Sequence, residues 1–541
     1  MIDARKSATL LVALAVLNCG LTFHNVWPTL GITWRGELSV ELAMVLVVLA
    51  AITAMWGRVS SRVLTVLSAL FVLFAIGRYG EVTAPALYGR EVNLYWDLQH
   101  VASVTGMLTR VAPTWIIVAG GAGLAGALAL LYFAARWSFG RVARSLQARG
   151  AQLAFGAAGA VLIAWFAVQR LNESMPRVPK FSTPVSNTYA VQATKMFETY
   201  AARHGSTSLP ASPVLASKLS ALDGSDVLVV FLESYGSVTY DRAEFLSALA
   251  PSRERLNAAI RETGRGVVST FAGSPTFGGS SWFAHLSFMS GIEVGDPVRY
   301  ALLMTQKRET LVSVFTKAGY RTVAAMPGLR QNWPEGGFYG FDDIYGAERL
   351  DYRGPAFGWW RIPDQFAFAK LDALEIEPRP RTPVFAMLTT ITTHMPFTPT
   401  PPLQENWSRV LTAQPYDAEP LRESLARQPE WTNMGKDYVS TIGYTLDTIA
   451  AYLRARKDDN FVMIVLGDHQ PAANVSGEGA SWDVPVHVIA GRPEILEALR
   501  MSGFAAGLTP NRQHPVRISE LAPVMLHAFT RTTATKAVGA D

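Results

Sequence analysis

Five long apolar stretches in the first third of the chain limit what it can fold into. They cover residues 8–24, 40–56, 64–79, 115–135 and 151–169, and almost no charged side chain interrupts them. A helix needs about 20 apolar residues to cross the hydrocarbon core of a bilayer. The first stretch alone resembles a signal peptide, but four more follow it without an obvious cleavage site. The pattern therefore predicts a transmembrane domain of five helices over residues 1–170.

Basic residues in the short loops predict how these helices are oriented. Arg5 and Lys6 precede the first stretch, and Arg58 and Arg62 lie between the second and the third. The loop between the fourth and fifth stretches is also basic, with Arg136, Arg141, Arg144 and Arg149. Cytoplasmic loops of membrane proteins carry an excess of Lys and Arg. We therefore expect a multi-pass plasma (inner) membrane protein with a cytoplasmic N-terminus and a periplasmic or extracellular domain after the fifth helix.

The composition argues against some functions. Cys19 is the only cysteine and lies in the first apolar stretch, so the exported part has neither thiol catalysis nor a cysteine-ligated zinc site. The net charge of +5 comes partly from arginines that flank the apolar stretches, and no basic stripe with interleaved aromatic residues accompanies it. We therefore expect the membrane, and no nucleic acid, as a partner.

The rest of the chain divides into a linker and an α/β domain. Prolines punctuate residues 171–224, which predicts a linker, and the domain covers residues 225–541. Strands are predicted over 226–233, 266–272, 321–326, 383–391, 461–466 and 484–490. Helices are predicted over 242–262, 281–290, 308–318, 363–374, 418–428, 435–456, 493–502 and 517–528. This alternation is typical of a central, mostly parallel sheet covered by helices on both faces.

Two of the predicted strands end in side chains that bind hard metal ions. Val227–Leu232 is a continuous apolar run followed by Glu233, and Phe461–Leu466 is another, followed by Gly467, Asp468 and His469. Buried parallel strands have this composition, and ligands bind beyond the carboxyl ends of such strands. The glycine suggests a turn that lets Asp468 and His469 converge. The two runs therefore predict a metal site of Glu233, Asp468 and His469, although a strand-end Glu can also cap a neighbouring helix.

A candidate nucleophile lies between the two runs. Gly278-Gly279 leads into Ser280-Ser281, where a helix is predicted to begin. The N-terminus of a helix stabilises anions. A serine oxygen on a metal could attack phosphorus or sulfur there. The alternative is an ordinary serine N-cap.

Together these motifs resemble the sulfatase and alkaline phosphatase superfamily over residues 225–530. The best resemblance is to its membrane-anchored branch of lipoteichoic acid synthases and phosphoglycerol and phosphoethanolamine transferases, which also has five N-terminal spans. The family's metal Glu matches Glu233, its Gly-Asp-His matches Gly467-Asp468-His469, and its Thr nucleophile falls at Ser280–Ser281.

The resemblance also favours one serine. Sulfatases have a nucleophile, an Arg four residues later, and Thr-Gly at the ninth and tenth positions. Counted from Ser281 these positions hold His285 and Ser290-Gly291, whereas counting from Ser280 loses the glycine. The resemblance therefore implies Ser281 as nucleophile and metal ligand, with Ser280 as the alternative.

Three further residues are implied as contacts of the substrate. His394, in Thr392-Thr393-His394, matches a histidine that contacts the headgroup, and as a catalytic residue it could protonate a leaving alkoxide. Trp333 matches a pocket tryptophan. Glu335 stands where the family has an Arg, which leaves the headgroup open. His285 either touches substrate or packs in the core.

The resemblance implies a two-step transfer of a phospho-headgroup. Phosphoglycerol or phosphoethanolamine would pass from a phospholipid donor to an envelope glycan or lipid acceptor through a phosphoseryl intermediate. One divalent metal ion is implied, with manganese favoured and zinc or magnesium possible. The sulfatase Pro-Ser-Arg core is replaced by Phe283-Ala284-His285, which argues against sulfatase activity. A hydrolase of sulfuric esters or phosphodiesters is the alternative.

Overall fold

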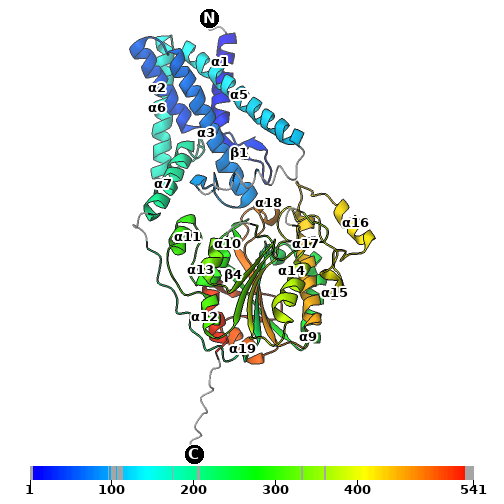
Figure 1. The fold of residues 1–541 in the computed structure, drawn as a ribbon. Coiled ribbons are helices and arrows are strands. Elements are labelled where there is room, and N and C mark those ends of the chain that lie inside the picture. The colour runs from blue at the N-terminus through cyan, green and yellow to red at the C-terminus, as the bar shows by residue number, and fades with distance from the viewer. Residues whose placement is uncertain are drawn as a thin grey trace, which may run out of the picture. The chain divides into compact units, whose positions relative to one another are not determined.

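The computed structural model describes residues 4–95, 97–98, 101, 105, 114–172, 175–203, 208–330, 333–358 and 361–530. The chain divides into two compact units, Met1–Tyr200 and Ala201–Asp541 (Figure 1). The predicted three-part division at residues 170 and 224 stays a prediction.

Helices make up most of the first unit, and each predicted apolar stretch forms one. They are α1 (Ala4–Thr22), α2 (Val40–Trp56), α3 (Ser61–Tyr88), α5 (Thr114–Ser145) and α6 (Arg149–Leu171), with α7 (Val185–Arg203) after them. A short hairpin of β1 (Phe23–Asn25) and β2 (Ile32–Trp34) follows α1. Capping fixes the ends of α2, because the Ser39 side chain accepts from Leu42 N and Gly57 ends the helix in the left-handed conformation.

Three of these helices suit a membrane. Among the described residues, α3, α5 and α6 are long and apolar enough to cross a bilayer by length and composition, and α2 is apolar but shorter. Their outward side chains include exposed Leu130 and Leu153, which would be costly in water. The number of five spans and their orientation stay predictions.

A mixed sheet forms the centre of the second unit. The order is β10-β4-β9-β8-β3-β7-β5-β6, and β11 also pairs with β4. The strands are β3 (Asp226–Leu232), β4 (Gly266–Gly273), β5 (Arg321–Met326), β6 (Asp343–Gly346), β7 (Val384–Thr389), β8 (Phe461–Gly467), β9 (Asp483–Ala490), β10 (Ala505–Ala506) and β11 (Asn511–Arg517). The run from β8 to β6 is parallel, while β9 is antiparallel to both of its neighbours. The predicted α/β fold with a mostly parallel sheet is confirmed.

Helices cover both faces of this sheet (Figure 1). One face packs against α10 (Ser281–Ser290), α12 (Leu311–Lys317), α19 (Pro493–Met501) and α20 (Ile518–Ala528). The other face packs against α9 (Ala243–Glu262), α14 (Asp364–Leu371) and α17 (Gly435–Ala455). Along β3, Val227 and Val229 face the first core while Leu228 and Val230 face the second. Burial on both faces explains the uninterrupted apolar run.

The remaining elements of the second unit are short. They are α8 (Val238–Asp241), α11 (Pro297–Met304), α13 (Pro334–Tyr339), the π-helical turn η1 (Asp372–Ile376), α15 (Trp407–Val410), α16 (Ala418–Ala426) and α18 (Ala473–Ser476). The sequence patterns missed β6, β10, β11, α8, α11, α13, α15 and α18. Most of these elements are too short for a hydrophobic period to show, and β11 has polar residues where the other strands have apolar runs.

The pairing of β3 with β8 places the two metal-binding motifs side by side. The two strands are parallel and in register from Asp226↔Phe461 to Leu232↔Gly467. Glu233 and Asp468 are the next residues of the two strands. They therefore emerge together at the carboxyl end of the sheet.

Candidate metal centre

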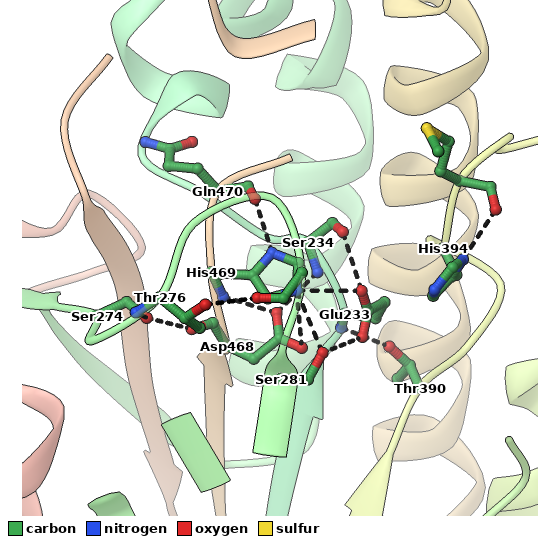
Figure 2. Close-up of polar contacts among 12 residues, drawn as sticks. Glu233, Ser234, Ser274, Thr276, Ser281, Thr390, His394, Asp468, His469 and Gln470 are labelled. Carbon is green, nitrogen blue, oxygen red and sulfur yellow. Dashed lines mark hydrogen bonds and ion pairs between the residues drawn. The ribbon is translucent and has the colours of Figure 1, made fainter. Parts of the chain in front are cut away.

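Glu233, Asp468 and His469 form a compact buried cluster beyond β3 and β8. Each offers a ligand atom, and these atoms lie within 4.8 Å of one another. His469 Nε2 is 3.3 Å from Glu233 Oε1 and 3.8 Å from Asp468 Oδ2. Figure 2 shows the three side chains pointing toward one another. The side chains that the sequence places on two distant motifs therefore meet at one point.

Hydrogen bonds orient the ligand atoms of this cluster. Asp468 Oδ1 accepts from Ser234 N at 2.8 Å and from His469 N at 2.7 Å. Asp468 Oδ2 is buried and accepts no hydrogen bond among the described residues. His469 Nδ1 donates to Gln470 O at 2.7 Å, which turns Nε2 toward the carboxylates. A histidine whose far nitrogen donates to a carbonyl is oriented as metal-binding histidines are.

Two glycines allow the strand ends to come this close. A Cβ on Gly467 would lie 1.9 Å from Tyr235 O, and one on Gly236 would lie 1.8 Å from Gln470 Oε1. Gly467 is the last residue of β8, so the expected turn begins after it. The glycine thus admits the neighbouring backbone just before the predicted turn.

Ser281 brings a hydroxyl to the cluster from the first position of α10. Ser281 Oγ donates to Glu233 Oε2 at 2.9 Å and lies 3.2 Å from His469 Nε2 (Figure 2). Ser280 is the N-cap with φ 65°, and its side chain makes no capping bond. Of the two candidate serines, the structure thus brings Ser281 into contact with the cluster.

The loop before α10 is tied to the same cluster. Ser274 Oγ donates to Asp468 O at 2.5 Å, and Gly278 N donates to Gln470 O at 3.1 Å. Thr276 Oγ1 closes the loop by donating to Gly279 O at 2.5 Å. Positive φ angles at Gly278 and Gly279 make this path possible. The hydroxyl and the carboxylates are therefore held by one connected set of bonds.

The charges of the cluster are strongly coupled. Burial opposes ionisation of Glu233, but the neighbouring His469 outweighs it, so the pKa of Glu233 is lowered. Burial and the charge of Glu233 raise the pKa of Asp468 to about 8. Burial opposes protonation of His469, yet Asp468 and Glu233 raise its pKa to about 9. A divalent cation here would compete with these protons, as in metal sites generally.

The donor set fits a divalent metal ion. Two carboxylates, one imidazole nitrogen and a hydroxyl are hard or borderline ligands that suit manganese, zinc or magnesium. The buried Asp468 Oδ2 without a donor is the clearest sign, because such an atom needs a partner. Among the described residues no Lys or Arg pairs with Glu233 or Asp468, whose ion pairs are with His469. Glu233, Ser281, Asp468 and His469 are thus the residues that could hold the ion.

The predicted substrate residues lie at different places. His394 follows β7 on the Glu233 side of the cluster (Figure 2), and its Nδ1 donates to Met395 O at 2.8 Å. Trp333 packs against Tyr339 and stacks on Phe341 with ring centroids 6.3 Å apart. His285 is buried against Phe231 at 4.3 Å between ring centroids, and burial lowers its pKa to about 3. The environment of His285 therefore favours packing over contact with substrate.

Sequence reasoning missed the residues that support the cluster. Ser234 adopts φ 59°, and its Oγ donates to Glu233 Oε1 at 3.1 Å. Thr390 Oγ1 accepts from Glu233 N at 3.0 Å, and Tyr438 OH donates to Ser234 O at 2.9 Å. The sequence offered one usable sign of these residues. Hydroxyl residues follow β3 and β7 at their carboxyl ends, which is where a metal site needs donors.

The comparison with protein families identifies the class of this domain. Residues 227–488 match the family model described as Sulfatase, and this span contains Glu233, Ser281, Asp468 and His469. The second unit therefore contains a domain of the sulfatase family, in agreement with the superfamily resemblance predicted from the sequence. No curated protein matches the chain significantly by sequence.

Several solved structures are similar to the chain at low sequence identity. The phosphoethanolamine transferase EptA from Neisseria meningitidis is 12% identical with a TM-score of 0.47, covering 91% of this chain and 89% of its own. The lipoteichoic acid synthase LtaP from Listeria monocytogenes is 14% identical with a TM-score of 0.38, covering 62% of this chain and 78% of its own. The phosphoglycerol transferase GacH from Streptococcus pyogenes is 10% identical with a TM-score of 0.36, covering 63% and 81%.

Proposed function

We propose that this protein is a metal-dependent transferase of phospho-headgroups at the outer face of the plasma membrane. It moves phosphoglycerol or phosphoethanolamine from a phospholipid to a glycan or lipid acceptor. Ser281 carries the group as a phosphoseryl intermediate. Proteins with these two transfer activities are among the solved structures of similar fold.

One observation carries the proposal. The Ser281 hydroxyl is held between the Glu233 carboxylate and the His469 imidazole, at the start of a helix and beside an oxygen of Asp468 that has no donor. A structural serine N-cap would bond to the backbone of its own helix. This hydroxyl instead donates to the Glu233 carboxylate and lies beside the His469 imidazole, which suits a nucleophile that gives up its proton to a neighbouring base.

The two half-reactions follow from these contacts. Ser281 Oγ forms a bond to the donor phosphorus and gives its proton to the acidic cluster, while the bond from phosphorus to the diacylglycerol oxygen breaks. His394 protonates the departing oxygen. In the second half, an acceptor hydroxyl gives its proton to His394 and attacks the phosphoserine. The bond from phosphorus to Ser281 Oγ breaks, the acceptor keeps the phospho-headgroup, and Ser281 regains its proton from the cluster. The N-terminal amides of α10 stabilise the negative charge on the phosphoryl oxygens.

A divalent metal ion on Glu233, Ser281, Asp468 and His469 would lower the pKa of the serine and neutralise charge on phosphorus. Manganese is the ion we favour, with zinc or magnesium as the alternatives. The apolar helices of the first unit fit a lipid donor, because they confine the domain to the bilayer surface. The proposed topology has five spans with the catalytic domain outside.

Mass spectrometry of the protein purified from its own membranes tests the intermediate. We expect a fraction of the peptide that contains Ser280 and Ser281 to carry an adduct, and its mass identifies the headgroup. Fragmentation should place the adduct on Ser281. Ser281→Ala should remove it. Ser280→Gly should keep it, because Ser280 has φ 65°, a conformation that glycine adopts readily.

The hydrolase alternative makes a different prediction in the same preparation. A hydrolase would release the free phospho-headgroup, or sulfate from a sulfate ester, at the same rate with or without an acceptor. A transferase would release product only when an acceptor hydroxyl is present. Complete absence of an adduct during turnover would count against the covalent mechanism.

A further inference from the structure

Asp364, a buried carboxylate outside the cluster, holds the segment that carries His394. It is the first residue of α14 and is 0% exposed. Its Oδ1 accepts from Ile391 N at 2.7 Å and from Thr392 N at 3.0 Å. Its Oδ2 accepts from Thr445 Oγ1 at 2.8 Å, and its own N–H donates to Thr392 Oγ1 at 3.2 Å. Both carboxylate oxygens are therefore used to fix one turn against α14 and α17.

This turn connects the metal cluster to His394. Thr390 bonds to Glu233 N at 3.0 Å and to Phe231 O at 2.9 Å, so the segment starts beside the cluster. Ile391 and Thr392 are the two residues that Asp364 holds. His394 N then donates to Ile391 O at 3.1 Å. The path from Glu233 to the imidazole thus depends on Asp364 at its midpoint.

The next residue of α14 holds the far end of the same segment. Gln365 is also 0% exposed, and its Nε2 donates to Gln404 O at 2.7 Å. Gln404 N donates back to Gln365 Oε1 at 3.0 Å. Residues 391–404 are therefore fixed at both ends by the first turn of α14. A cavity of about 20 Å³ lies along this segment, lined by residues that include Ile391, Thr392 and His394.

We propose that Asp364 is a positioning residue that sets the place of the His394 imidazole relative to Glu233. A carboxylate is suited to this, because it can accept several backbone N–H bonds at once in a buried site. The role of His394 in the reaction rests on the proposed function. The placement of the Ile391–His394 turn by Asp364 does not.

A double-mutant cycle in the full-length protein in detergent micelles tests this coupling. Transfer from phosphatidylglycerol or phosphatidylethanolamine is measured with manganese for Asp364→Ala, His394→Ala and the double variant. We expect each single variant to lower kcat by about 100-fold, as loss of a general acid does, with little change in KM. The double variant should be no more than about threefold slower than His394→Ala alone. Multiplied effects would overturn the proposal.

Two further variants separate positioning from general stability. Asp364→Asn keeps one oxygen that can accept both amides and should restore most of kcat. The matched control is Asp226→Ala, because Asp226 is a buried carboxylate that accepts from Val384 N at 2.8 Å, at the opposite end of β7. It should lower the Tm while leaving kcat within about threefold. An equal loss of kcat in Asp226→Ala would mean that Asp364 acts only through stability.

Hydrogen exchange tests whether Asp364 holds the Ile391–His394 turn, even if no transfer is detected. The amides of Ile391 and Thr392 should exchange slowly in the wild-type protein, although they lie in a loop. Asp364→Ala should speed exchange in residues 391–397 and leave residues 461–469 unchanged. Exchange at the rate of an exposed loop in the wild-type protein would overturn the proposal, whether or not the variant folds. A protein with this protection but without transfer or hydrolysis would instead contradict the proposed function.

Discussion

A buried carboxylate lies at each end of strand β3, and the two carboxylates have different kinds of partners. Asp226, at the first position, is paired with Arg381 at 2.7 and 2.5 Å and accepts from Val384 N. Glu233, just past the last position, has His469 and the Ser281 and Ser234 hydroxyls as partners, with a second carboxylate beside it. One end has its charge neutralised by the protein. The other places two buried carboxylates together with His469 and, among the described residues, no Lys or Arg partner.

The same contrast holds for neighbouring acids near the amino ends of the strands. Glu375 pairs with Arg321, the first residue of β5, at 2.9 Å. Asp372 lies 3.7 Å from Arg456, in the loop that leads into β8. An arginine partner offsets part of the cost of burying an acid, whereas a buried acid pair without one is costly unless a cation binds. One end of the sheet thus carries acids paired with arginines, and the other carries the candidate metal site.

The largest expected effect is on the reaction itself. Ser281→Ala should lower transfer by roughly 10³-fold or more, because the nucleophile is lost. Ser225→Ala is the control from the other end of the sheet, where Ser225 Oγ donates to Leu222 O. It should leave the rate within about threefold. Steady-state kinetics of both variants measures the two losses of rate. If they were equal, the contrast between the two ends of the sheet would not hold.

The next effect is on metal affinity. Asp468→Asn should weaken manganese binding by roughly 100-fold, since it replaces a ligand oxygen that has no other partner. Asp226→Asn should retain the metal. Metal analysis after dialysis gives the result, and a chelator should lower the Tm of the wild-type protein but not of Asp468→Asn. Full metal content in Asp468→Asn would show that Asp468 is not a metal ligand.

A stability effect of about 3 kcal/mol is expected for Asp226→Asn. The change leaves Arg381 without its carboxylate while its side chain is only 16% exposed, and breaking a buried pair costs about that much. Thermal unfolding at constant metal concentration measures it. Asp351→Asn is the control, because the Asp351–Arg353 pair is exposed and should not change the Tm. Equal shifts would show that burial does not decide the strength of these pairs.

The smallest effect concerns the pH dependence of stability. Burial raises the pKa of Asp372 to about 7, against the attraction of Arg456. Between its ordinary value and about 7, the folded protein keeps a proton that the unfolded chain releases, so this group's contribution to stability falls as pH rises. Asp372→Asn should therefore gain free energy of unfolding relative to wild type as the pH rises from 4 to above 7, which denaturant unfolding over this range measures. A constant difference across pH would contradict the shifted pKa.

The sequence predicted the central sheet and the meeting of the two metal-binding motifs. It did not predict the contacts between separate elements that support them. The apolar runs of β3 and β8 carry their own signal because both faces are buried, and parallel pairing then places Glu233 beside Asp468. The antiparallel direction of β9 leaves no mark in a run of apolar residues. The contact of Asp364 with Ile391 joins separate elements, so no local pattern reveals it. The burial of His285 likewise depends on Phe231 from another element.

The order of the strands also decides when the centre can exist during synthesis. Ser281 and His469 are 188 residues apart, and Ser234 and Asp468 are 234 apart. Strand β8 lies between β3 and β9, so its late arrival completes the middle of the sheet. Contacts of such long separation form slowly. The candidate metal site therefore assembles only after nearly the whole domain has been made.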